Sequence, residues 1–173
     1  YEIAKLDKTA GVAAPHGPFA RVLEIGCGEG LLTQRLAPMA KAMLAGDISD
    51  LAVTRARERF ADLGNVRVER MDILVDEFQE SFDLVAASEV LYYLERDQLP
   101  EAVEKVKSLV KPGGALLLAH ARALADDNSG VEKKSFGAKT IHGLFIADPD
   151  FQVVDDLLEP GYRITFLRRK SGS

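Results

Sequence analysis

Residues 22–30 read VLEIGCGEG, and this short stretch decides the fold class. An apolar run that predicts a buried strand leads into three glycines spaced two apart, Gly26, Gly28 and Gly30, and a helical pattern follows. A strand, a glycine-rich turn and a helix in this order let a ligand approach bare backbone. The stretch therefore predicts an α/β fold with a ligand site at the end of its first strand.

Short apolar runs alternate with amphipathic stretches along the rest of the chain. The apolar runs predict strands at residues 21–26, 42–48, 66–73, 82–88, 115–121, 151–159 and 162–170. Helices are expected at residues 31–37, from a cap at Ser49 to about Gly64, from about Asp97 to Val110, and at about 138–147. Residues 111–114, KPGG, predict a helix stop and a turn.

The last two predicted strands are separated by Pro160 and Gly161 alone. Such a connection is too short for a parallel crossover, so these strands are expected to form an antiparallel hairpin. Strands that alternate with helices otherwise predict a parallel sheet. We therefore expect an α/β, Rossmann-like open sheet of about seven strands. It is mostly parallel, with an antiparallel C-terminal edge hairpin and helices on both faces.

Composition limits the class of protein. A chain of 173 residues that is 47 % hydrophobic predicts one domain over residues 1–173. The net charge of −5 leaves no basic field for nucleic acid or an anionic membrane surface. No apolar run of about 18 residues and no signal-like start is seen. The single cysteine, Cys27, excludes an internal disulfide and fits a reducing compartment. A cytoplasmic location is expected.

Residues 122–137 interrupt the pattern, because they are polar and without a clear period. A loop of this length in a compact domain is more often a functional lid than a connector. Residues 122–147 are therefore expected to form a lid and a helix on the acceptor side of the site.

The glycine loop does not match the common nucleotide motifs. A dinucleotide fingerprint needs a third glycine that packs the helix, and position 31 is leucine. No P-loop lysine follows either. The loop fits a ligand that carries a carboxylate and an amine, and Glu24 adds a negative group that favours a cation. A tight turn without a ligand remains the alternative.

Two acidic residues follow later strands. Asp47 ends the second strand, where a carboxylate can accept both ribose hydroxyls of an adenosine cofactor. A helix cap for the segment that starts at Ser49 is the alternative. Asp72 can accept the adenine amine while Ile73 covers the ring, and an ordinary turn aspartate is the alternative.

The fourth strand ends in SEVLYY, residues 88–93, at the edge where open α/β sheets bind ligands. Ser88 and Glu89 are therefore candidate site residues. Tyr92 and Tyr93 offer aromatic faces that attract a sulfonium or an ammonium by roughly 0.5–2 kcal/mol. One tyrosine of the pair is expected to pack in the core, and the sequence does not say which.

Taken together, VLEIGCGEG, Asp47, Asp72-Ile73, FDLVAASEVLYYL and LVKPGG resemble class I S-adenosylmethionine (SAM)-dependent methyltransferases. The resemblance spans nearly the whole chain. SEVLYYLE, HAR after the PGG strand, and the AKTI helix are most similar to the nodulation N-methyltransferase (NodS-like) group, which methylates an amine of a chitooligosaccharide. His120 departs from the small, serine-like residue of that group.

The resemblance implies SAM as cofactor and S-adenosylhomocysteine as product. It implies that residues 1–20 form an approach segment that folds over the cofactor. The residues that it implies around the cofactor are Glu24, Gly26, Cys27, Gly28 and Gly30 beside the methionine part, Asp47 and Ile48 at the ribose, Asp72 and Ile73 at the adenine, and Ser88 and Glu89 near the sulfur.

Methyl transfer from a sulfonium is an in-line displacement, and an acceptor amine must lose a proton to attack. His120 is the first candidate base, and a strand-end histidine with a satisfied hydrogen bond is the alternative. Glu89 is the second candidate, and Tyr92 is expected to orient the acceptor. His16 and His142 are expected to be structural or to face solvent. No metal site is expected, because Asp83 begins its strand at the opposite edge from His120 and Glu89.

These observations predict a SAM-dependent methyltransferase that acts on a small-molecule acceptor. The acceptor group that they favour is an amine of a sugar or oligosaccharide. An O-methyltransferase of a small hydroxylated metabolite and a non-catalytic SAM-binding module remain alternatives. A nicotinamide-dependent oxidoreductase is disfavoured by the missing third glycine. SEVL also lacks the N/D-P-P-Y/F signature of enzymes that methylate nucleic-acid amines. Neither nucleic acid nor a membrane is expected as a partner, and the sequence leaves a monomer or a weak dimer open.

Overall fold

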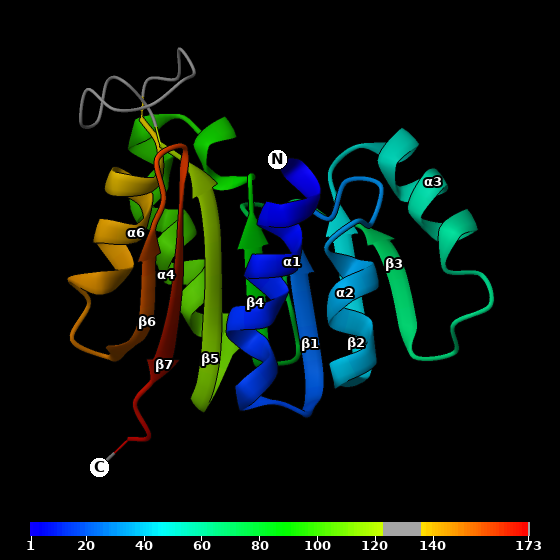
Figure 1. Cartoon of the computed structure of the whole chain (residues 1–173), viewed down its shortest axis with the longest axis horizontal. Helices are drawn as coiled ribbons and strands as arrows, with labels where there is room; N and C mark the ends of the chain where they lie inside the picture. Colours follow the sequence, from blue (N-terminus) through cyan, green and yellow to red (C-terminus); the bar gives the residue numbers. More distant parts are fainter. Residues whose placement is uncertain (123–135, 173) are drawn as a thin grey trace.

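The computed structural model of the chain describes residues 1–122 and 136–172. Its seven-stranded sheet has the order β3-β2-β1-β4-β5-β7-β6 (Figure 1). The strands are β1 Phe19–Ile25, β2 Ala40–Asp47, β3 Val66–Arg70, β4 Phe82–Ser88, β5 Val110–Ala121, β6 Phe151–Leu158 and β7 Tyr162–Arg169. The first five are parallel, and β7 pairs antiparallel with both β5 and β6. The predicted sheet and its C-terminal hairpin are confirmed.

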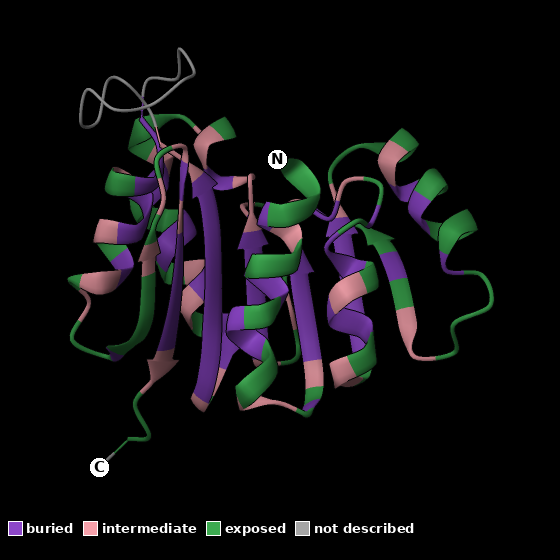
Figure 2. Ribbon diagram, viewed as in Figure 1, coloured by how far each residue is buried: buried purple, intermediate pink, exposed green. Residues whose placement is uncertain are grey.

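Helices cover both faces of the sheet. They are α1 Glu2–Ala13, α2 Thr33–Leu36, α3 Asp50–Arg59, α4 Leu99–Leu109 and α6 Ala138–Ile146. The side chains of successive strand residues alternate between the two faces. Val22 joins the apolar cluster of α1 and α2, whereas Leu23 joins that of α4 and α6, and α3 packs on β2 and β3. Figure 2 accordingly shows the central strands buried and the outer helix surfaces exposed.

Three predicted boundaries were wrong. Helix α3 ends at Arg59 rather than near Gly64, because Phe60 turns inward to pack in the core and Leu63 closes a turn on its carbonyl. Strand β3 ends at Arg70, which leaves Asp72 and Ile73 in the following loop. Residues 111–114 are not a turn between elements, because β5 already begins at Val110. The extra residues form an irregularity in its pairing with β4, with Gly113 at φ +80°.

The predicted lid lies almost wholly on residues 123–135, outside the described part of the chain. Phe136, the first described residue after it, is buried in the cluster of α4 and α6. Over the described ranges, none of the helices has the length and apolar character needed to cross a bilayer.

The strand order places a topological switch between β1 and β4. From β1 the chain first moves outward through β2 to β3, and it then returns to β4 on the other side of β1. In open α/β sheets, ligands bind in the crevice at the carboxyl ends of strands at such a point. The N-terminus of α1 lies at this same edge, near the tips of β1 and β4 (Figure 1).

Candidate functional site

A cavity of about 670 Å³ opens at the carboxyl ends of β1, β2 and β4. Most of the residues predicted from the sequence to hold a cofactor line it: Glu24, Gly26, Cys27, Gly28, Asp47, Ile48, Asp72, Ile73, Ser88 and Glu89. The lining also includes residues that were not predicted: Glu2 and Leu6 from α1, and Leu31 and Leu32. Their contribution depends on how α1 and α2 pack, and no local motif marks it.

The three glycines of the loop serve different purposes. All three have positive φ, which disfavours any side chain. A Cβ on Gly28 would meet open space, so the backbone there is open to a ligand, whereas a Cβ on Gly26 would collide with Val90. A Cβ on Gly30 would collide with the ring of Phe60, and Gly30 does not line the cavity. Gly30 therefore lets α3 approach the loop.

Asp47 is held in place by the loop. Its Oδ2 accepts a hydrogen bond from the Gly28 N–H at 2.8 Å and its Oδ1 accepts one from the Ser49 N–H at 2.9 Å. The cap of α3 is Ser49, whose hydroxyl oxygen accepts from the Ala52 N–H at 3.2 Å. Asp47 is thus not the helix cap. Each of its oxygens has a second lone pair for a hydroxyl donor in the cavity.

Asp72 forms a turn and lines the cavity as well. Its Oδ1 accepts from the Leu74 N–H at 3.0 Å, and its own N–H donates to Asp76 at 2.7 Å. Ile73 is buried beside it. Asp72 is therefore a turn aspartate, as in the alternative interpretation, and its carboxylate still lines the cavity.

Glu24 lies beneath the cavity and is fully buried. Burial raises the pKa of its carboxyl to about 8, opposed by a hydrogen bond from the Thr33 hydroxyl and aided by the negative charge of Asp47. Glu24 therefore holds a proton at neutral pH. Burial first, and then the charges of Glu24 and Asp47, raise the pKa of the Cys27 thiol to about 12, so this thiol is a poor nucleophile.

Glu89 is the centre of a small polar cluster at the end of β4. It is the one non-glycine residue with positive φ (+53°) among the described residues, and its N–H donates to the Ala119 carbonyl at 2.8 Å. Lys5, from α1, forms an ion pair with Oε1, and the Tyr92 hydroxyl donates to Oε2. The side chain of Lys5 is 4 % exposed and that of Glu89 is 27 % exposed. The structure thus brings Glu89 and Tyr92 together.

The two tyrosines have different places. Tyr92 packs against the apolar cluster of α4 and α6 while its hydroxyl reaches Glu89. Tyr93 lines the cavity and is 71 % exposed. The core member of the pair is therefore Tyr92.

His120 lies behind the cluster, fully buried and outside the cavity lining. Its Nε2 accepts from the Leu91 N–H at 3.3 Å, so Nδ1 carries the proton and donates to Nε2 of His142 at 3.1 Å. His142 Nδ1 then donates to the Thr165 hydroxyl at 2.6 Å, which donates to Asp156 at 2.9 Å. Both ring nitrogens of His120 are engaged, as in the alternative of a satisfied histidine.

Burial keeps both histidines of this chain neutral. It lowers the pKa of His120 to about 3, with a further contribution from the positive charge of Lys5. It also lowers the pKa of His142 well below the usual value, and electrostatic interactions with His120 and with the Arg163 guanidinium add to this. His142 therefore does not face solvent. Its place on the apolar stripe of α6, with Ala138, Ile141 and Phe145, was a signal that could have identified it as buried.

His16 is remote from the cavity, since its ring stacks on Phe166 at 4.5 Å between centroids. The part of the chain that the structure describes holds no group of three His, Cys, Asp or Glu side chains suited to a metal ion.

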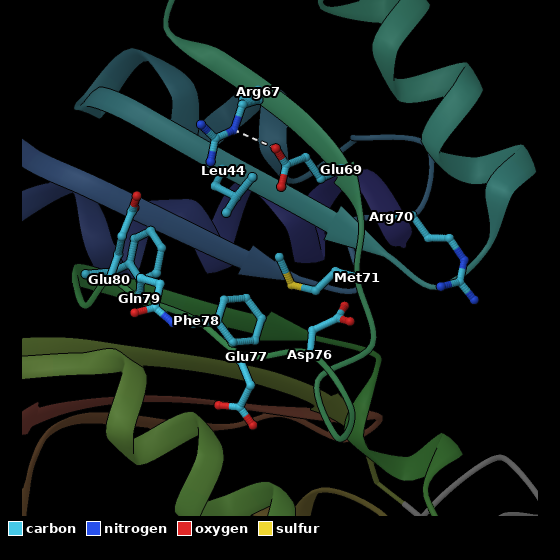
Figure 3. A pocket seen from close by; sticks show the side chains of 11 residues that line it. Leu44, Arg67, Glu69, Arg70, Met71, Asp76, Glu77, Phe78, Gln79 and Glu80 are labelled. Atoms are coloured by element: carbon cyan, nitrogen blue, oxygen red, sulfur yellow. Dashed lines mark ion pairs between the residues drawn. The ribbon is translucent and has the colours of Figure 1, made fainter.

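A second cavity, of about 400 Å³, lies between β3 and the loop before β4 (Figure 3). None of its lining residues comes from a helix, and Leu44, Met71 and Phe82 are among them. Several of its charged side chains already have partners. Arg67 pairs with Glu69 at 2.9 Å, and Lys105 pairs with Glu77 at 3.5 Å. Three of the charged side chains that line this cavity, Arg67, Glu69 and Glu77, are therefore engaged with protein partners.

Comparison with known proteins agrees with this geometry. The family model "Methyltransferase domain" matches residues 22–114, more than half of the chain. Nodulation protein S of Sinorhizobium fredii is 33 % identical over 106 residues, which are 61 % of this chain and 49 % of that protein. Nodulation protein S of Bradyrhizobium diazoefficiens is 32 % identical over 131 residues, 75 % of this chain and 61 % of that protein. The chain thus spans about half to three-fifths of these relatives.

A solved structure of high similarity is that of the N-methyltransferase NodS from Bradyrhizobium japonicum WM9 in complex with S-adenosyl-L-homocysteine. It has a TM-score of 0.85 and 25 % identity, and the alignment covers 96 % of this chain and 86 % of that one. The chain therefore belongs to the methyltransferase domain family, in the class I fold that it shares with NodS.

Proposed function

We propose that the protein transfers a methyl group from SAM to an amine of a sugar or oligosaccharide. The observation that carries this proposal is the carboxylate of Glu89, which lines the large cavity and already holds an ammonium group, that of Lys5. A carboxylate at this point suits an amine acceptor, since it binds the ammonium form and can take its proton. The name of NodS, an N-methyltransferase, points to the same chemistry.

The cavity fits SAM in size and in the hydrogen-bonding groups that line it. Its volume is in the range of about 300–1,000 Å³ that small-molecule sites occupy. In this proposal Asp47 binds the ribose hydroxyls, and Asp72 with Ile73 binds the adenine. The open backbone at Gly28 and the nearby Glu24 would hold the amino-acid end of the cofactor. When bound, the cofactor supplies a methyl group on a positively charged sulfur.

The acceptor amine loses one proton and gains the methyl group. Glu89 accepts the proton from the ammonium, and the nitrogen lone pair then forms the N–CH₃ bond as the S–CH₃ bond breaks with its electrons left on sulfur. Tyr92 orients the carboxylate through its hydroxyl. His120, with no nitrogen free, positions the turn at Leu91 instead of acting as the base. Most of the rate enhancement then comes from aligning the amine with the methyl group.

The test is a methylation assay on a matched pair of acceptors. Glucosamine and N-acetylglucosamine have the same hydroxyl groups and differ only at the nitrogen on carbon 2, where glucosamine alone has a free amine. We expect the protein with SAM to give N-methylglucosamine, detected by mass spectrometry, and Glu89→Gln to lose at least about 100-fold in kcat.

Other outcomes would redirect the proposal. Methylation of both sugars on oxygen would favour the O-methyltransferase alternative and contradict the proposed role of Glu89. Binding of S-adenosylhomocysteine without methylation of glucosamine or of a deacetylated chitooligosaccharide would contradict the sugar amine and favour a non-catalytic module or another acceptor.

A further inference from the structure

The Glu89 cluster has the chemistry of a binding site for a primary ammonium. Lys5 contributes the ammonium, Glu89 the opposite charge, and the ring of Tyr162 lies 5.6 Å from Lys5 Nζ, within the range of a cation–π contact. A lysine charge is costly to bury unless it is paired in this way. Since the Lys5 side chain is 4 % exposed, the cluster is a built ammonium site.

This site adjoins the cofactor cavity. Glu89 itself lines the cavity, and so do Glu2 and Leu6, which flank Lys5 on α1. A primary amine that came to Glu89 from the cavity would meet the same carboxylate that the Lys5 ammonium holds. The two ammonium groups would compete for it.

Helix α1 is built so that its first turns can release this contact. Its buried apolar residues, Ala10, Val12 and Ala13, lie in the second half, whereas Lys5 is the buried residue of the first half. Lys8 and Asp7 form exposed pairs with Glu159 and Arg35, and exposed pairs contribute only about 0–1 kcal/mol. In the first half of α1, Lys5 is thus the one fully buried side chain, beside the partly buried Leu6.

We propose that the Lys5 ammonium occupies, in the free protein, the place on Glu89 that the ammonium of the acceptor takes, and that acceptor binding displaces Lys5 and releases the first turns of α1. This inference rests on the proposed function and deepens it. It makes a primary amine the acceptor class, and it makes α1 a gate over the cavity. Displacement also removes a positive charge from Glu89, which lets the carboxylate accept the proton of the amine.

The first experiment measures binding of glucosamine to the protein loaded with S-adenosylhomocysteine. Lys5→Met removes the competing charge at nearly constant side-chain length. If Lys5 leaves Glu89 free in about a tenth of the molecules, Lys5→Met should bind glucosamine about tenfold more tightly than the unmodified protein. Lys8→Met, the same change on the same helix, should leave the affinity unchanged.

The second experiment uses the unmodified protein, so it tests the displacement of Lys5 even if the Lys5→Met variant does not fold. Hydrogen exchange of the amides of residues 2–8 should become faster when glucosamine is added to the loaded protein. N-acetylglucosamine, which has no ammonium, should have no effect.

The outcomes separate the two proposals. Glucosamine affinity that is equal in Lys5→Met and Lys8→Met, or slower exchange in α1 on adding glucosamine, would overturn the displacement alone. No binding of glucosamine or of a deacetylated chitooligosaccharide to any of these proteins, with S-adenosylhomocysteine binding intact, would overturn the amine acceptor as well.

Discussion

At the scale of single residues, the glycine loop separates ligand binding from packing within five positions. Gly28 faces open space at the cavity, whereas the α-carbon of Gly30 lies against the ring of Phe60. The spacing of the glycines predicted the loop but gave all three the same role. Only the position of Phe60, thirty residues further along the chain, distinguishes Gly30 from its neighbours.

This difference predicts that an alanine at Gly30 mainly lowers stability, whereas an alanine at Gly28 mainly weakens ligand binding. Gly30→Ala should lower the free energy of unfolding by about 3 kcal/mol, because the new methyl overlaps a buried ring at positive φ. Gly28→Ala should cost only about 1 kcal/mol, for the backbone conformation, but should weaken S-adenosylhomocysteine binding. Urea unfolding and calorimetry measure the two quantities. Equal losses of stability in the two variants would contradict the assignment of roles.

Glu24 predicts that stability falls as pH rises from about 4.5 to about 8. Its carboxyl has a pKa near 4.5 in the unfolded chain and about 8 in the folded one, so the unfolded state has lost a proton that the folded state keeps. Stability must then fall as pH rises between these values, by up to about 1.4 kcal/mol per pH unit, or about 2 kcal/mol from pH 6.5 to pH 8. Glu24→Gln should abolish this fall in urea unfolding. An unchanged slope in the variant would mean that Glu24 is ionised in the folded protein.

At the scale of secondary-structure elements, two helices deliver the side chains that the sequence could not place. Helix α1 brings Lys5 to Glu89 across 84 positions of the chain, and α6 brings His142 to His120. The ends of β1, β2 and β4 were predictable, because apolar runs and turn residues mark them locally. Contacts between helices and strand ends depend on packing, so neither Lys5 nor His142 carried a local signal for its partner.

The pairing of α6 with the sheet predicts a loss of stability on mild acidification. The unfolded imidazoles take up protons near pH 6.5, whereas burial keeps His120 neutral to about pH 3 and His142 neutral well below its usual pKa. Stability should therefore fall as pH falls from 6.5 to about 5, against the opposite but smaller effect of Glu24. In urea unfolding, Glu24→Gln should show a steeper fall than the unmodified protein. Stability that stays constant or rises over this range would contradict the buried, neutral pair.

At the scale of the whole molecule, the strand order determines where the site lies. The reversal between β1 and β4 gathers Glu24, Asp47 and Glu89 from three strands at one edge of the sheet. The alternation of strands and helices was sufficient to predict this edge. It was not sufficient to identify the base, because the sequence places His120 and Glu89 at neighbouring strand ends and only packing buries His120.

The most direct test of the central claim, that this edge holds SAM, is calorimetric titration with S-adenosylhomocysteine and, separately, with NAD. The account predicts binding of S-adenosylhomocysteine, loss of at least tenfold in affinity in Asp47→Ala, and no response to NAD. Asp50→Ala is the matched control, since Asp50 lies three residues away, begins α3 and is absent from the cavity lining, and it should bind as the unmodified protein does. Binding of NAD in place of S-adenosylhomocysteine, or equal affinities in the two variants, would contradict the assignment of the cavity.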